Sequence, residues 1–120
     1  MRRMLIVDDE SKICECLSNF FSTRGFQVHA ALTGTEAIEW LMNQRADVIL
    51  LDIRLPDMPG IEVLKRAKEL YPEVKVIMVT ALDKEDPEIE AKAYGACGYV
   101  TKPFDFSDLT WAPVFADDPH

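Results

Sequence analysis

Residues 48–60 read VILLDIRLPDMPG, and this stretch decides the fold expected for the chain. It begins with four consecutive apolar residues and turns polar at Asp52. A continuous apolar run, without the alternation of a half-exposed strand, indicates a strand buried on both faces, as in a parallel sheet. The mixed polarity of residues 27–31 is typical of an edge strand instead. The further strand candidates are residues 4–7, 76–79 and 98–101, which makes five strands in all.

Amphipathic helical patterns separate these strands. The first is expected to end at Gly25, and Thr33 is placed to cap the second. Because strands alternate with helices, the sequence predicts an α/β fold with helices on both faces of a parallel sheet. The expected helices cover residues 13–21, 34–42, 60–70 and 84–94.

The C-terminal end of the chain gives a weaker pattern. Residues 104–109 could begin a fifth helix. Pro113 and Pro119 oppose a long one, because proline lacks a backbone donor and clashes inside a helix. We therefore expect a domain over residues 1–111 and an irregular tail over residues 112–120.

Composition narrows the class of protein. The 120 residues include 21 acidic and 13 basic side chains, a formal charge of −8, which disfavours direct binding to nucleic acid. No apolar run approaches the roughly 18 residues of a membrane span, and the acidic residues 8–10 end the short apolar stretch at the N-terminus too early for a signal peptide. Three cysteines, an odd number, favour a reducing, cytoplasmic setting.

Polar side chains follow the expected strands at the point where each strand ends. In open parallel sheets the carboxyl ends of the strands form the ligand-binding edge, so these groups should meet there. Crowded carboxylates repel one another unless a cation joins them, and oxygen-only ligands favour a hard ion such as Mg²⁺. A carboxylate, a cation and an ammonium group together suit phosphoryl transfer to an aspartate. The residues concerned are Asp8, Asp9, Asp52, Thr80 and Lys102.

At this point the chain resembles the receiver domain of bacterial two-component response regulators, over about residues 4–106. The resemblance implies a flavodoxin-like, doubly wound five-stranded parallel sheet with the strand order 2-1-3-4-5. It rests on the acidic pair Asp8-Asp9, residues 51–60, the pair Thr80-Ala81, and residues 99–104.

The resemblance assigns roles to the residues at the phosphorylation site. Asp52 would be the phosphoacceptor and would take its phosphoryl group from a histidine of a partner kinase. Mg²⁺ would be held by Asp9, Asp52 and the backbone carbonyl of Arg54, with Asp8 acting mainly through a bound water. Lys102 would pair with the phosphoryl group.

The resemblance also assigns residues that carry the signal away from the site. Thr80 and the backbone of Ala81 would bind the phosphoryl group, and Thr80 would move as part of a switch. Tyr99 would swing inward behind Thr80. The bond between Lys102 and Pro103 would be cis, a geometry that proline tolerates.

Two other functions are alternatives to this signalling switch. A phosphohydrolase with an aspartate nucleophile typically has a second acid two residues later, where this chain has Arg54. A flavodoxin-like cofactor binder would need a hydroxyl-rich or glycine-rich loop after the first strand, where residues 8–10 are acidic. The switch itself implies a histidine kinase and a downstream protein or effector domain as partners. The acidic face formed by residues 83–111 is expected to meet that partner, and dimerisation is left open.

Overall fold

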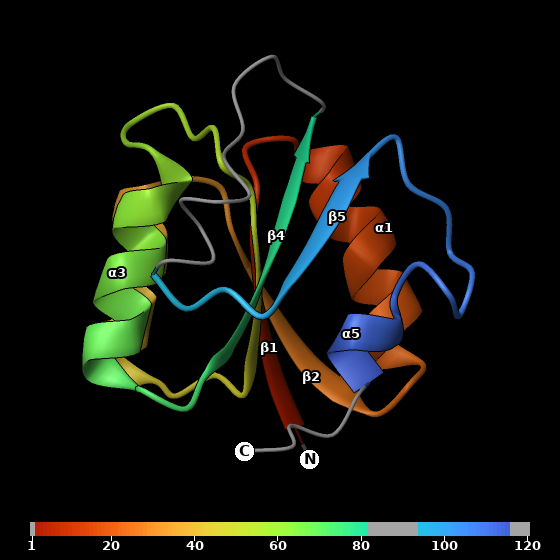
Figure 1. Ribbon diagram of the computed structural model, residues 1–120, viewed down its shortest axis with the longest axis horizontal. Helices are drawn as coiled ribbons and strands as arrows, with labels where there is room; N and C mark the ends of the chain where they lie inside the picture. The colour runs from red at the N-terminus through yellow and green to blue at the C-terminus, as the bar shows by residue number, and fades with distance from the viewer. Residues whose placement is uncertain (1, 82–93, 116–120) are drawn as a thin grey trace.

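The computed structural model describes residues 2–81 and 94–115 of the chain. Its centre is a five-stranded sheet with the order β2-β1-β3-β4-β5, in which every neighbouring pair is parallel (Figure 1). This confirms the fold class and strand order that the resemblance implied. The strands are β1 (Arg2–Val7), β2 (Phe26–Ala31), β3 (Val48–Leu51), β4 (Lys75–Ala81) and β5 (Gly98–Lys102).

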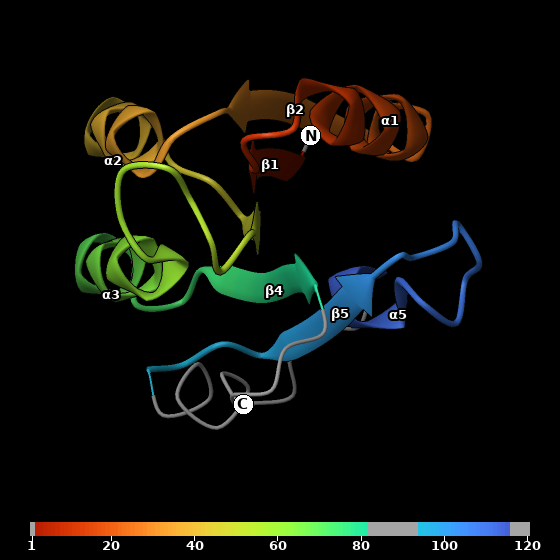
Figure 2. The ribbon, with the colours of Figure 1, turned by 90° about the horizontal axis from the view of Figure 1, so that it is seen from above.

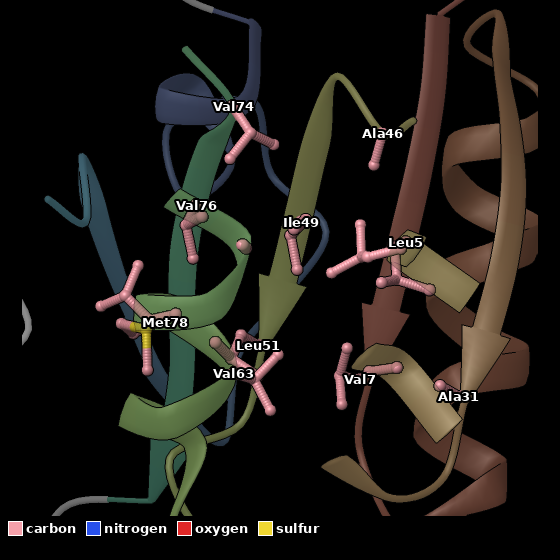
Figure 3. Close-up of a cluster of buried hydrophobic side chains, with 14 of the residues drawn as sticks. Leu5, Val7, Ala31, Ala46, Ile49, Leu51, Val63, Val74, Val76 and Met78 are labelled. Carbon is pink, nitrogen blue, oxygen red and sulfur yellow. The ribbon is translucent and has the colours of Figure 1, made fainter. Parts of the chain in front are cut away.

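Helices cover both faces of the sheet, as the sequence predicted. Figure 2 shows α2 (Gly34–Asn43) and α3 (Gly60–Leu70) on one side, and α1 (Ser11–Ser22) and α5 (Ala112–Phe115) on the other. Each face has its own buried apolar cluster, because successive strand residues point to opposite faces. Figure 3 shows the cluster under α2 and α3, with Leu5 and Val7 of β1 beside Ile49 and Leu51 of β3.

The helix ends follow local signals in the sequence. The Thr33 hydroxyl oxygen accepts a hydrogen bond from the backbone N–H of Glu36, which confirms the predicted cap of α2. Gly25 follows α1 with a φ of +91°, a left-handed conformation that glycine adopts without steric strain. The fourth predicted helix, residues 84–94, falls outside the described residues except for Tyr94, which lies in a turn.

The C-terminal end differs from the prediction. Residues 112–115, expected to be irregular, form the short helix α5, and residues 104–109 do not begin a helix. Pro113 lies in the first turn of α5, where its missing N–H breaks no helical hydrogen bond. Further upstream, the Asp105 carboxylate accepts hydrogen bonds from the hydroxyls of Ser107 and Thr110, which offers the backbone an alternative to helix.

Trp111 closes the core on the α1 side of the sheet. Its side chain is fully buried, and its ring centroid lies 5.4 Å from that of Phe21 in α1 and 5.1 Å from that of Phe104. Its indole N–H donates to the backbone oxygen of Asp105 at 2.7 Å, so the polar end of the buried ring is satisfied. A short helix and one buried indole therefore complete the cover that α1 provides on this face.

Candidate functional site

Asp8 and Asp52 lie side by side at the carboxyl edge of the sheet. They directly follow β1 and β3, which pair with each other, and the Asp52 N–H donates to the oxygen of Val7 at 2.9 Å. Between β1 and β3 the strand order reverses, and open α/β sheets bind ligands at such a point. Both residues are nearly inaccessible, with 2% of Asp8 and 6% of Asp52 exposed. The sheet thus brings two buried carboxylates together.

Lys102 reaches both carboxylates from the far edge of the sheet. Its Nζ lies 2.8 Å from Oδ2 of Asp8 and 3.2 Å from Oδ2 of Asp52, and 3.8 Å from Oε1 of Glu10. Lys102 is the last residue of β5, and β4 stands between β5 and β3, so the long side chain spans a strand. The peptide bond that follows it, to Pro103, is cis, as expected.

The other oxygen of each carboxylate is held by the backbone. Oδ1 of Asp8 accepts from the N–H of Glu10 at 2.9 Å, and Oδ1 of Asp52 accepts from the N–H of Arg54 at 3.1 Å. In both cases the donor is two residues further along the chain, the spacing of an Asx turn. Each carboxylate therefore has one oxygen fixed by its own loop and one oxygen facing Lys102.

The charges at the site do not balance. Burial raises the pKa of Asp52, although the Arg54 N–H and the Lys102 ammonium oppose this shift. Burial alone would lower the pKa of Lys102, but its hydrogen bond to Asp8 and its attraction to Asp52 outweigh that effect and raise it. One ammonium thus serves two carboxylates, which leaves a site that a further cation would stabilise.

We expect Asp52→Asn to raise the stability of the metal-free protein at neutral pH. Because the pKa of Asp52 is higher in the folded state than in the unfolded chain, the folded protein binds more protons, and stability falls as pH rises from about 4 through the folded pKa. Asparagine removes this loss, so the variant's advantage should shrink as the pH is lowered toward about 4. Thermal melts across this range and up to neutral pH, in EDTA, measure the difference. A variant that melts below wild type at neutral pH would contradict the raised pKa.

Asp8 also belongs to a group of carboxylates that could hold the cation. Oxygens of Asp8, Asp9 and Glu10 lie within 4.8 Å of one another, with Asp8 buried and the other two exposed. All the donors are oxygens, which fits Mg²⁺ and not a softer metal. Glu10 was not among the predicted ligands. Its position directly after the acidic pair could have suggested it as a ligand. Its approach to Lys102, however, depends on the path of the chain between β1 and α1, which the sequence does not show.

The loop after β3 closes on itself and carries Asp52 and Arg54. The N–H of Gly60 donates to the oxygen of Ile53 at 2.6 Å, and Arg54 forms an isolated antiparallel bridge with Pro59. A Cβ atom at Gly60 would collide with the backbone oxygen of Asp52 and come within 2.8 Å of the Ile53 Cα. Gly60, which was predicted only to begin α3, is therefore also the residue that lets the loop pack against Asp52.

The predicted switch residues lie on the neighbouring strands β4 and β5. For Thr80 and Ala81 the structure describes the backbone, which pairs in register with Thr101 and Lys102 of β5. Tyr99 pairs with Met78 and is half-buried, packed against the cluster under α2 and α3. The sheet thus aligns these positions with Lys102, whereas their movement stays a prediction.

Cys14 of α1 packs directly beneath the site. Its Sγ donates to the backbone oxygen of Asp8 at 3.3 Å, and the side chain is buried. Burial, helped by the nearby Asp8 carboxylate, raises the pKa of the thiol to about 11. The thiolate is the reactive form of cysteine, so Cys14 should be inert at neutral pH.

We expect two of the three thiols to react quickly with an aromatic disulfide reagent at mildly alkaline pH, and the third only after unfolding. Cys16 and Cys97 are exposed and should be the fast pair. The released thiolate can be counted by absorbance in buffer and in guanidinium chloride. In Cys14→Ala the count should be two under both conditions. Three fast thiols in the native wild type would show that Cys14 is not shielded.

The fold and this site together define a class of protein. The family model of the response regulator receiver domain matches residues 4–112, and the chain belongs to this family. It is 39% identical over 109 residues to the regulatory protein AtoC of Escherichia coli (strain K12), an alignment covering 91% of this chain and 24% of that protein. The chain thus spans about a quarter of the length of AtoC.

A second relative is closer to this chain in length. Sporulation initiation phosphotransferase F of Bacillus subtilis (strain 168) is 37% identical over 107 residues, which cover 89% of this chain and 86% of that protein. Solved structures of receiver domains have the same fold as this chain. A CheY-like receiver domain from Methanospirillum hungatei has a TM-score of 0.86 at 35% identity, covering 91% of this chain and 87% of that chain. Chemotaxis protein CheY4 of Vibrio cholerae has a TM-score of 0.83 at 32% identity, covering 91% and 92%.

Within residues 2–81 and 94–115, no helix has the length and apolar character needed to cross a bilayer.

Proposed function

We propose that this receiver domain accepts a phosphoryl group on Asp52 from a phosphohistidine of a partner kinase. The observation that carries the proposal is the arrangement of Asp52, Asp8 and Lys102, two buried carboxylates that share one ammonium group at the switch point of the sheet. A phosphoryl group on Asp52 would lie beside the Lys102 ammonium, which can stabilise its negative charge.

The chemical step is an in-line displacement at phosphorus. A carboxylate oxygen of Asp52 forms a bond to phosphorus as the P–N bond of the phosphohistidine breaks. The imidazole nitrogen keeps the electron pair and takes up a proton. Bound Mg²⁺ supplies positive charge against the phosphoryl oxygens, as metal ions do in phosphoryl transfer generally. It would be held by Asp9, Asp52 and the carbonyl of Arg54, with Asp8 acting through water.

Lys102 changes partners during this step. Before transfer its Nζ is shared between Asp8 and Asp52. Once Asp52 is phosphorylated it is an acyl phosphate, whose negative charge lies on the phosphoryl oxygens, and Lys102 pairs with one of these oxygens. The Thr80 hydroxyl and the Ala81 N–H donate to others, and Tyr99 moves inward behind Thr80. Phosphorylation therefore shifts the balance between two conformations, and the protein signals through the second.

The proposal implies a signalling protein without an outside substrate. The domain acts in the cytoplasm and catalyses its own phosphorylation and dephosphorylation, and its partners are a histidine kinase and a downstream protein or effector domain. The acidic composition of residues 83–111 supports a protein partner with a basic surface and disfavours direct nucleic-acid contact. The phosphohydrolase alternative has less support, because Arg54 stands where that class has its second acid.

A small phosphodonor tests the proposal without the kinase. We expect incubation with acetyl phosphate and Mg²⁺ to add one phosphoryl group to the intact protein, and omission of Mg²⁺ to prevent the addition. Asp52→Asn should show no such mass gain. Asp47→Asn is the matched control, since Asp47 lies before the amino end of the same strand, and it should be modified like wild type. A wild type that gains no mass, or an Asp52→Asn variant that gains as much, would reject the proposal.

A further inference from the structure

Residues 52–59, between β3 and α3, form the phosphoacceptor loop, and an exposed carboxylate on this loop binds the first turn of α2. Oδ1 of Asp57 accepts from the N–H of Gly34 at 2.9 Å, and Oδ2 accepts from the N–H and the hydroxyl of Thr35 at 2.8 and 2.6 Å. The hydroxyl and backbone donors of Thr35, with the N–H of Gly34, hold the pKa of Asp57 down at about 2. The carboxylate is therefore ionised throughout the physiological pH range.

These contacts have a second effect besides stabilising the start of α2. The first N–H groups of any helix lack partners within the helix. In α2 the cap residue Thr33 already serves the N–H of Glu36, while Asp57 serves the two N–H groups before it. A helix that has its own local cap does not need a carboxylate from 22 residues away in order to start. The added effect of Asp57 is to fasten its loop to the helix.

A second residue of the loop docks at the same place. A Cβ atom at Gly34 would come within 2.6 Å of the Met58 sulfur, so the Met58 side chain lies directly against the start of α2. Met58 is half-buried and packs against the cluster under α2 and α3. Two neighbouring loop residues, one charged and one apolar, thus rest on the first turn of this helix.

The same loop begins at Asp52, the phosphorylation site of the proposed function. Asp57 lies between Arg54 and Pro59, which form a bridge with each other, and the Arg54 N–H holds Oδ1 of Asp52 at 3.1 Å. A change in the position of the loop tip would pass through this bridge to Arg54. Arg54 touches the site with both its N–H and, in the proposed function, its carbonyl.

We propose that Asp57 is a positioning residue, which ties the tip of the phosphoacceptor loop to the N-terminus of α2 and so keeps the Arg54 carbonyl in place for the metal ion. The inference rests on the proposed function, because it needs Mg²⁺ at the site. It adds a coupling between α2 and metal binding that depends on one exposed carboxylate. Asp57 touches neither the metal nor the phosphoryl group, so its effect runs through Arg54.

Direct Mg²⁺ binding to the unphosphorylated protein tests this coupling. We expect Asp57→Ala to weaken Mg²⁺ affinity, measured by calorimetric titration, by about tenfold, the lower end of what loss of an outer partner costs a metal site. Asp57→Asn keeps one acceptor oxygen and should fall between Asp57→Ala and wild type. Thr33→Ala is the matched control, because it removes the local cap of α2 and destabilises the same turn without freeing the loop.

The outcomes distinguish a failure of the positioning role of Asp57 from a failure of the proposed function. Asp57 variants that melt earlier but bind Mg²⁺ like wild type would overturn the positioning role, as would a Thr33→Ala variant with an equal loss of affinity. Either result would leave phosphorylation at Asp52 intact. A wild type that binds no Mg²⁺ and accepts no phosphoryl group from acetyl phosphate would instead overturn the proposed function, and the coupling with it.

Discussion

Replacing Gly60 with alanine should destabilise the protein by about 3 kcal/mol or more, at or above the upper end of what overpacking usually costs. The added methyl group would overlap the backbone oxygen of Asp52 and crowd the Ile53 Cα. Backbone atoms cannot rotate away as a side chain can, so β3 or α3 must shift. Because this oxygen belongs to Asp52, the proposed phosphoacceptor, phosphorylation by acetyl phosphate should slow as well. Denaturant unfolding followed by circular dichroism measures the first effect.

Gly34→Ala is the matched control for this substitution. There the new methyl group would meet the outer atoms of the Met58 side chain, a flexible thioether that can move. We expect the loss of stability to be clearly smaller than for Gly60→Ala. If the two variants unfold at the same denaturant concentration, the close backbone contact at Gly60 is not the constraint that the structure indicates.

Replacing Lys102 with methionine should lower the rate of phosphorylation by about 100- to 1000-fold, the range found when one charge-stabilising donor is removed from an active site. Methionine keeps most of the length of the side chain and removes the ammonium that lies 2.8 Å from Asp8 and 3.2 Å from Asp52. Two buried carboxylates then lack their cation, and the pKa of Asp52, already raised by burial, should rise further. The rate loss should therefore be greatest at low pH.

A second lysine serves as the control for Lys102. Lys65 lies on α3 and pairs with Glu62 at 3.7 Å, so Lys65→Met removes the same charge away from the site. We expect this variant to be phosphorylated like wild type. Initial rates from intact-protein mass spectra, at mildly acidic and mildly alkaline pH, compare the variants. A Lys102→Met variant with an unchanged rate would show that the ammonium does not act on the phosphoryl group.

Much of the fold could be predicted because parallel strands carry a strong local signal. Residues 48–51 are buried on both faces of the sheet, so all of them must be apolar. The residue that follows lies at the carboxyl edge, where open parallel sheets bind ligands. Thr33 could likewise be recognised as a cap, since its partner Glu36 is three residues away. The acids after β1 and β3 could be predicted to lie close to each other, because adjacent parallel strands end at the same edge of the sheet.

Other features depend on contacts between distant segments and leave no local pattern. Asp57 caps a helix that begins 23 residues earlier, and nothing near position 57 indicates this. The stacking of His29 on Trp40, with ring centroids 5.1 Å apart, also depends on how α2 lies over β2. At the C-terminus Pro113 is expected to oppose a long helix, and α5 is indeed short, but residues 112–115 are still helical because the first turn of a helix tolerates proline.

The most direct test of the account is to locate the phosphoryl group in the phosphorylated wild type. Borohydride reduces an aspartyl phosphate to homoserine, which marks the modified position permanently, and peptide mass spectrometry then reads it. We expect homoserine in place of Asp52 alone, with no mark at Asp8, Asp9 or Asp57. A mark at any of those positions with Asp52 intact would contradict the claim that the buried carboxylate beside Lys102 is the phosphoacceptor.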